Sequence, residues 1–209
     1  MHFSISRVMT SISITIVITI GIQAAISYAS LTYLHDAVAE IAENRVPSFI
    51  HLGQLNTDLS DSRIAQSDYL SAAADKRSSF DEGLKSAFQA IDDDIRLYEP
   101  YLVDQADKDY LAAFKKKFAA ASADWAEVKK LVDAGKVDEA KAQFYGPALK
   151  TYEVAGNTLQ DAVNDMKGDV SGKGSDALSA IESAMLKTMG ALGLLLLLSI
   201  GTGIFTFGY

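Results

Sequence analysis

Two long stretches without a charged side chain lie at the two ends of this chain, over residues 8–34 and 188–209. A helix needs about 20 apolar residues to cross the hydrocarbon core of a bilayer, and both stretches reach that length. Apart from His2 and Arg7, every Asp, Glu, Lys, Arg and His lies between them. This arrangement predicts two transmembrane helices that flank one polar segment, residues 35–187.

The first apolar stretch allows two other interpretations. Residues 11–20 alternate polar and apolar side chains, which is typical of a strand. The uncharged run continues far past strand length, however, and an isolated strand in lipid would leave its backbone unpaired. Arg7 followed by Ser27-Tyr28-Ala29 is similar to a cleaved signal peptide, but the apolar run is longer than the usual one of about 7–15 residues. We therefore predict an uncleaved transmembrane helix.

The single Arg7 sets the expected orientation. A short basic N-terminus favours the cytoplasmic side, so residues 1–7 are predicted to form a cytoplasmic tail. Two spans then place residues 35–187 outside, which is the periplasm of a Gram-negative cell. The expected location is the bacterial inner membrane, as a multi-pass protein. The second span ends without a basic flank, and we expect the cytoplasmic signalling part to be absent from this chain.

The polar segment between the spans shows helical periodicity throughout. Its apolar residues recur at steps of three and four along four stretches, for example Leu111, Phe114, Phe118, Ala121 and Trp125. Short turns between long helices require antiparallel neighbours. We therefore predict an all-α protein, an antiparallel up-and-down four-helix bundle continuous with two transmembrane helices.

Breaks in the pattern mark the expected helix boundaries. The first helix is predicted to be kinked by Pro47 and to close at residues 72–76, and the second ends at Glu99-Pro100. Gly135 suits a left-handed cap after the third helix. The fourth helix restarts at Val137, with Pro147 near its beginning.

Several classes of chemistry are disfavoured by the composition. The chain has no cysteine, which excludes disulfides, cysteine metal sites and thiol catalysis. His35 and His51 lie too far apart along one helix to share a metal, and we found no nucleotide-binding, nucleophile or zinc motif. The net charge of −8 argues against nucleic acid as a partner. We expect no enzyme activity, catalytic residue, metal or cofactor.

Two charge runs are interpreted as solvated helix faces. Residues 92–94 are three consecutive aspartates and residues 115–117 three consecutive lysines. Consecutive residues on a helix point in different directions, so the aspartates form no ready metal cage. The lysines are interpreted as surface residues and not as a polyanion site.

The candidate ligand site comes from an interruption of the first helix's apolar stripe. The stripe runs through Leu55 and Leu59, and its next positions, Ser62 and Gln66, are polar, with Arg63 beside them. An arginine fork pairs with carboxylates in a bidentate manner. The alternative is an ion pair from Arg63 to Asp61 or Asp68, or a solvated arginine. The predicted ligand-binding residues are Arg63, Gln66, Tyr69, Tyr145, Thr151 and Tyr152.

The layout resembles the four-helix-bundle sensor region of methyl-accepting chemotaxis proteins. The likeness is carried by the basic tail, the two anchors, Arg45-Val46-Pro47-Ser48 on the first helix, and the turn at residues 134–140. It implies a homodimer through the first helix and ligand binding near that interface through first-helix arginines. Only Arg63 maps onto that role, because Arg45 and Arg77 are distant, whereas the aspartate-type receptors carry several such arginines.

These observations predict a transmembrane chemoreceptor sensor module. It would detect an extracytoplasmic small molecule, an organic acid or amino acid, or else a periplasmic binding protein, and transmit the signal across the inner membrane to control chemotaxis. Two alternatives stay open: the sensory region of a membrane histidine kinase or cyclic-dinucleotide enzyme, and a non-signalling membrane-anchored bundle. The expected partners are therefore the membrane, a second copy of the chain and that ligand.

Overall fold

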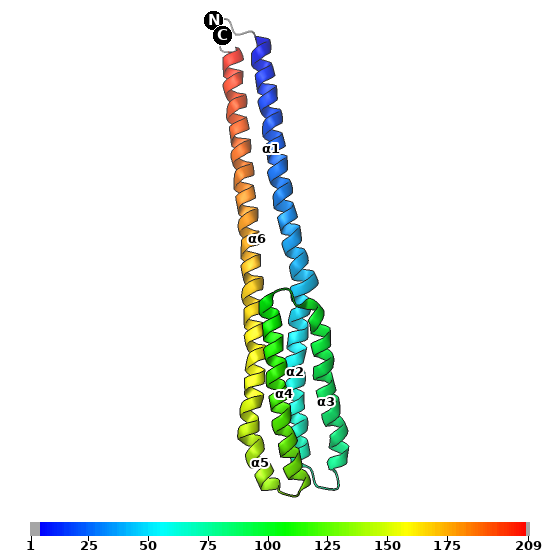
Figure 1. The fold of residues 1–209 in the computed structure, drawn as a ribbon. Helices are drawn as coiled ribbons and strands as arrows, with labels where there is room; N and C mark the ends of the chain where they lie inside the picture. The colour runs from blue at the N-terminus through cyan, green and yellow to red at the C-terminus, as the bar shows by residue number, and fades with distance from the viewer. Residues whose placement is uncertain (1–4, 208–209) are drawn as a thin grey trace. The chain divides into compact units, whose positions relative to one another are not determined.

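The protein is almost entirely helical, with short turns between helices, over residues 5–207, the part that the computed structural model describes, and no strand occurs there (Figure 1). The long helices are α1 (Ile5–Glu40), α2 (Val46–Ser71), α3 (Arg77–Tyr98), α4 (Gln105–Asp133) and α6 (Pro147–Phe207). The shorter elements are the π-helical turn η1 (Ile41–Arg45), the 3₁₀ turn η2 (Glu99–Tyr101) and α5 (Val137–Tyr145). The all-α fold with a four-helix bundle is confirmed.

The chain divides into two compact units. One comprises residues 41–170, in which α2, α3, α4, α5 and the first part of α6 lie side by side (Figure 1). The other comprises residues 1–40 and 171–209, in which α1 runs beside the last part of α6 and Gln23 donates a hydrogen bond to Thr188. The boundaries predicted from charge, at residues 7, 34 and 187, stay predictions.

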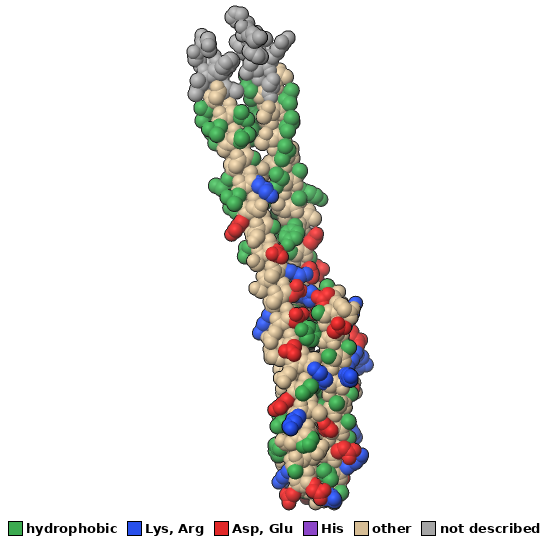
Figure 2. All heavy atoms as spheres, turned by 60° about the vertical axis from the view of Figure 1, so that its left-hand side comes forward, with side chains coloured by type: hydrophobic (Ala, Val, Ile, Leu, Met, Phe, Trp, Pro, Cys, Tyr) green, Lys and Arg blue, Asp and Glu red, His purple; other side chains and the backbone are tan. Residues whose placement is uncertain are grey.

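Two helical stretches are long and apolar enough to cross a membrane. They lie within Ile12–Ser71 and Val137–Leu198, and their most apolar windows are not buried inside the protein. On the stretch formed by α1 and the last part of α6, apolar side chains are prominent and charged ones are few (Figure 2). Acidic and basic side chains are instead scattered over the bundle (Figure 2). Length and composition thus agree with two spans.

The bundle core consists of two hydrophobic clusters. One is built on fully buried Leu55, Ile91, Phe114 and Ala155, and the other surrounds Trp125. Burying one such large apolar side chain contributes about 1.5–3 kcal/mol relative to leaving it exposed. Both clusters combine α2, α3, α4 and α6, and the second also includes α5, so together they join all the helices of the bundle.

Pro47 and Pro147 both interrupt helices of the bundle. Pro47 has no N–H for the carbonyl of Glu43, and the disturbance expected there takes the form of η1, directly before α2. Pro147 was expected within one fourth helix, but the structure ends α5 at Tyr145 and starts α6 at Pro147. The reason is the same, because Pro147 cannot donate to Gln143 and its ring clashes with the preceding turn.

The prediction that residues 92–94 form a solvated face is wrong for Asp94. Asp92 is exposed, but Asp94 is only 8% exposed and faces Asp58 on α2. Successive side chains on a helix are rotated by about 100°, so the third carboxylate necessarily points elsewhere than the first. Of the three lysines, Lys115 and Lys116 are exposed, and the half-buried Lys117 donates to Thr158 at 2.8 Å.

The turn after α4 confirms the predicted glycine cap. Gly135 has φ +77°, its N–H donates to Val132 at 3.0 Å, and the N–H of Lys136 donates to Leu131 at 2.9 Å. This pair of bonds is the Schellman motif, which places a left-handed residue after the helix.

Substituting Gly135→Ala is expected to lower the free energy of unfolding by about 1 kcal/mol, because a Cβ disfavours the left-handed conformation. Gly83→Ala is the matched control: it lies inside α3 with open space around its would-be Cβ and should raise stability by about 0.5–1 kcal/mol. Thermal unfolding of the full chain in nanodiscs, followed by circular dichroism, measures both. Shifts of the same sign would contradict the conformational explanation.

Candidate functional site

Polar side chains occupy core positions in the middle of α2. Leu52, Leu55 and Leu59 are buried, and the helix then buries Ser62 and Gln66 instead of further aliphatic residues. The hydroxyl of Ser62 donates back to the Leu59 carbonyl at 2.6 Å, which satisfies it within its own helix. A buried polar interruption of this kind needs partners, and Gln66 finds one in Arg63.

Arg63 lies half-buried between α2 and the α5–α6 junction. Its Nη1 donates to Oε1 of Gln66 at 3.2 Å, and its Nη2 donates to the main-chain oxygen of Phe144 at 2.7 Å. The guanidinium carbon lies 3.4 Å from the centre of the Phe144 ring and 5.3 Å from that of Tyr152. Stacking on aromatic faces is a favourable environment for an arginine.

The break between α5 and α6 explains why the Phe144 carbonyl can accept this bond. The last carbonyls of a helix lack intrahelical donors. Because α5 ends at Tyr145 and Pro147 offers no N–H, the end of α5 exposes such carbonyls toward α2. Arg63 satisfies one of them, so the proline that interrupts the fourth helix also helps to position the arginine.

The positive charge of Arg63 has only neutral hydrogen-bond partners among the described residues. Neither Asp61 nor Asp68 forms an ion pair with it in this part of the chain, so the alternative interpretation of an internal salt bridge is wrong. Desolvation by burial lowers the pKa of Arg63 below its ordinary value, opposed by Tyr152, Tyr145 and Glu153. Even so, the guanidinium stays charged at any physiological pH.

Of the six residues predicted to bind a ligand, the structure brings some together and separates others. Gln66 and Tyr152 contact or face Arg63, and Tyr145 is exposed beside Phe144, with ring centres 5.0 Å apart. Tyr69 is turned to α4, and Thr151 donates to Asp124 at 2.8 Å. Membership of these residues in a ligand site stays a prediction.

Tyr69 belongs to a separate polar network. Its hydroxyl donates to Asp133 at 2.7 Å and accepts from Lys129 at 2.8 Å, while its ring packs edge-on against Trp125. Burial raises the pKa of Tyr69, and the hydrogen bond from Lys129 opposes this. The network links α2 to the end of α4.

Comparison with known proteins identifies the fold. Residues 2–176 match the family model described as a four-helix-bundle sensory module for signal transduction. The chain belongs to this family. No curated protein matches the sequence. The match spans the first apolar helix and the whole bundle, residues 41–170.

The sensory module contains a second arginine site that sequence reasoning missed. Arg45, 3% exposed at the end of η1, is 3.2 Å from Asp107, 3.3 Å from Asp104 and 2.6 Å from Asp169. Burial alone would lower the pKa of Arg45, but Asp169, Asp107 and Asp104 together raise it. The three carboxylates come from α4 and its cap and from α6, so the arginine joins the start of α2 to the start of α4 and to the interior of α6.

The acidic partners of Arg45 are themselves preorganised. Asp104 caps α4 by accepting from the N–H of Asp107 at 2.9 Å, and Asp107 accepts from the N–H of Val103 at 3.0 Å. The Asp-x-x-Asp spacing of this capping box is readable from sequence. Its partnership with Arg45 is not, because the residues lie about 60 positions apart and meet only in the folded bundle.

Proposed function

We propose that this sensory module is the input part of a transmembrane chemoreceptor that binds a small carboxylate-bearing ligand at Arg63 and passes the signal to the other side of the inner membrane. The observation that carries the proposal is the half-buried guanidinium of Arg63, whose described partners are a side-chain amide, a carbonyl and two aromatic rings. A buried charge without a counter-ion is costly, and a carboxylate would complete it.

The chemistry around Arg63 favours an organic acid over a simple inorganic anion. Phe144 and Tyr152 present aromatic surface beside the guanidinium, which suits an apolar carbon skeleton. The exposed ring of Tyr145 adjoins Phe144 and carries a hydroxyl that can bond a second polar group of the ligand. An amino acid would in addition need an acceptor for its ammonium group, and Glu153 is an acidic group whose charge acts on Arg63.

Helix α6 supplies a route for the signal. It runs without interruption from Pro147 to Phe207, and it contains both Tyr152 and the second candidate span. A ligand that binds more tightly to one arrangement of the α5–α6 junction than to another shifts the population toward the first. A change in the α5–α6 arrangement costs the least free energy at the Gly146–Pro147 break beside Phe144, because the helical hydrogen bonds are already interrupted there.

The proposal includes a homodimer that packs through α2. Several large apolar side chains of this helix are exposed although they lie in the bundle: Val46, Phe49, Ile50 and Ile64. Exposed apolar patches of this kind mark interaction surfaces. A second copy presenting the same face would bury them and bring the two Arg63 sites close to one interface, as the family resemblance implies.

Arg63→Ala is expected to weaken binding of the cognate organic acid at least about tenfold, because a charge-assisted bidentate contact is lost. The measurement is a screen of organic acids and amino acids by thermal shift on the full chain in nanodiscs, followed by isothermal titration of each hit. Arg63→Lys keeps the charge without the planar fork, so its affinity for the ligand should lie between those of the natural chain and of Arg63→Ala.

The matched control is Lys150→Ala, which removes an exposed cation from α6 near Tyr152 and should leave affinity unchanged. A ligand that binds the Arg63→Ala variant as tightly as the natural chain would remove Arg63 from the site. If no small acid binds but a periplasmic solute-binding protein does, then direct ligand binding is wrong while the sensory role stands.

A further inference from the structure

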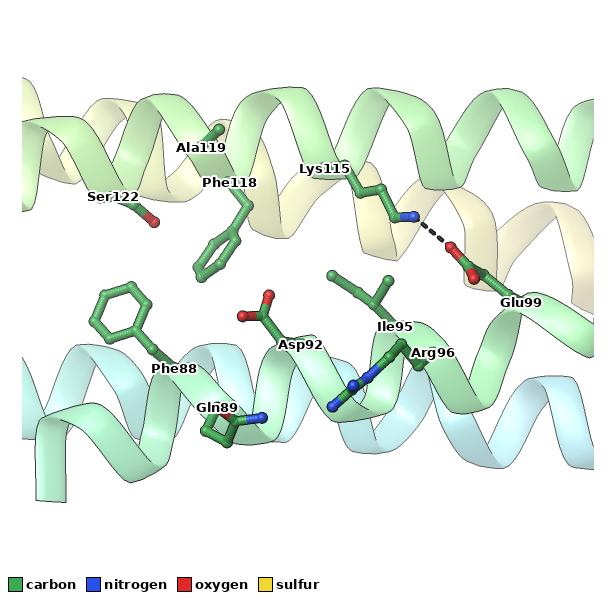
Figure 3. Close-up of a pocket in the computed structure, with 10 residues that line it drawn as sticks. All are labelled: Phe88, Gln89, Asp92, Ile95, Arg96, Glu99, Lys115, Phe118, Ala119 and Ser122. Atoms are coloured by element: carbon green, nitrogen blue, oxygen red, sulfur yellow. Dashed lines mark hydrogen bonds and ion pairs between the residues drawn. The ribbon is translucent and has the colours of Figure 1, made fainter.

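An open groove separates α3 from α4 on a part of the bundle that the Arg63 site does not use (Figure 3). It has a volume of about 620 Å³, and α3 and α4 form its two walls. Ile95 and Phe118 make its floor apolar, while the charged side chains of Arg96, Glu99 and Lys115 stand at one end. A hollow of this volume falls within the size range of small-molecule sites, about 300–1,000 Å³.

Two aromatic rings face this groove from opposite walls. Phe88 of α3 and Phe118 of α4 have ring centres 5.7 Å apart with planes tilted by 36°. Phe118 in turn stacks on the fully buried Phe114 at 5.7 Å, so the core holds it in place. A ligand in the groove would therefore contact both rings. The negative face of an aromatic ring attracts cations.

One carboxylate points into the groove without a counter-ion. Figure 3 shows Asp92 of α3 pointing into the gap between α3 and α4, beside Phe118. The basic residues that line the groove are already engaged: Lys115 pairs with Glu99, and Arg96 pairs with Asp93. Asp92 makes no hydrogen bond or ion pair to any described residue. With the lysine and arginine neutralised, the unbalanced charge at the centre of the groove is negative.

We infer that this groove is a second ligand site, which takes a small organic ammonium ion. The cation would lie over the packed pair of rings, Phe88 and Phe118, with its charge against Asp92, and its apolar part would cover Ile95. A carboxylate combined with two aromatic rings meets both requirements of such a ligand, since the rings attract the weakly hydrated cation and the carboxylate provides the counter-charge.

Other occupants fit the groove less well. A carboxylate ligand would be repelled by Asp92 and would have to displace Glu99 from Lys115 or Asp93 from Arg96. A bare divalent metal needs several oxygen ligands, and within the described residues no group of three acidic, His or Cys side chains is placed to hold one. The site is thus complementary in charge to the acid-binding site proposed at Arg63.

The test uses choline and phenethylammonium as probes, titrated calorimetrically into the full chain in nanodiscs. We expect dissociation constants of about a millimolar, since the groove is open to solvent. Asp92→Asn, which keeps the shape, should weaken both probes about tenfold, and Phe118→Leu should weaken them several-fold. Glu82→Gln removes an exposed carboxylate of α3 that does not line the groove, and it should change affinity less than about twofold.

Neutral analogues separate charge from shape. 2-Phenylethanol and 3,3-dimethylbutan-1-ol have the same outlines without the charge and should bind at least about tenfold more weakly. Equal binding of the neutral analogues, tighter binding of phenylacetate, or unchanged affinity in Asp92→Asn would each overturn the proposal, as would no binding of either cation. Arg63→Ala should leave cation binding intact, so the failure of one site is distinguishable from the failure of the other.

Discussion

Replacing Arg45 with alanine is expected to lower the free energy of unfolding by about 3–5 kcal/mol, the typical cost of breaking a buried ion pair from one side. The loss comes from the partners that stay behind. Asp107 is 5% exposed, and both it and Asp169 would keep a negative charge close to Asp104 with no cation between them. The main-chain bonds to Asp104 and Asp107 persist, which places the expected value near the lower end.

Urea unfolding of the full chain in nanodiscs, followed by circular dichroism, measures this effect. Arg45→Lys should recover part of the stability, because it restores the charge without the fork that reaches three carboxylates. Arg96→Ala is the matched control: its partner Asp93 is half-exposed, and a surface pair contributes about 0–1 kcal/mol. Equal losses in Arg45→Ala and Arg96→Ala would show that burial of the Arg45 cluster does not matter for stability.

Replacing Asp94 with asparagine is expected to stabilise the bundle above pH 7 by about 2–3 kcal/mol. Burial raises the pKa of Asp94 to about 6, and the hydrogen bond and the charge of Asp58 and the charge of Asp93 act in the same direction. In water Asp94 would give up its proton near pH 4. Ionisation within the bundle is therefore costly, and asparagine removes that cost while keeping a donor toward Asp58.

The sign of the pH dependence follows from linkage. Between about pH 4 and pH 6 the folded protein holds the Asp94 proton that the unfolded chain has lost, so this residue's contribution to stability falls as pH rises. Above about pH 6 both states are ionised and the contribution becomes constant. The difference between Asp94→Asn and the natural chain should therefore grow from pH 4 to about pH 6.5 and then level off.

Thermal unfolding at pH 4.5, 6 and 8 tests this expectation, with the neighbouring Asp92→Asn as the control. Asp92 is exposed, so its substitution should shift stability by less than about 0.5 kcal/mol at every pH. A difference for Asp94→Asn that stays flat over this range would mean that the proton is not shared with Asp58. A destabilised variant at pH 8 would mean that the ionised form is satisfied by partners other than Asp58.

The large features of this protein were readable because they depend on local patterns. Each of these features is recognised from residues close together in the chain: a charge-free stretch of bilayer length, apolar residues at steps of three and four, and the helix-ending Gly135. The helices, the helix breaks near Pro47 and Pro100, and the left-handed cap follow from such short-range constraints. Polar residues at the Ser62 and Gln66 positions likewise marked the place where α2 departs from a simple apolar stripe.

The contacts that define the sites depend on residues far apart in the chain. Arg63 was predictable as an unusual residue, but its bond to the Phe144 carbonyl exists only because the α5–α6 break brings that carbonyl to α2. Thr151, one of the residues predicted to bind a ligand, donates to Asp124 of α4. Rotation about a helix axis changes by about 100° per residue, so a small difference in how helices pack decides which neighbour a side chain meets.

The sequence by itself determined an all-α bundle with two apolar helices, because periodicity and charge-free length need no knowledge of packing, whereas the expected sensory role came from the resemblance to a known family. Only the tertiary structure decided that Arg45 is buried among three carboxylates, that Asp94 faces Asp58, and that Asp92 points into a groove beside Phe118. Charged residues look alike in sequence whether solvated or buried. Their burial, and hence their chemistry, is set by the helices that pack against them.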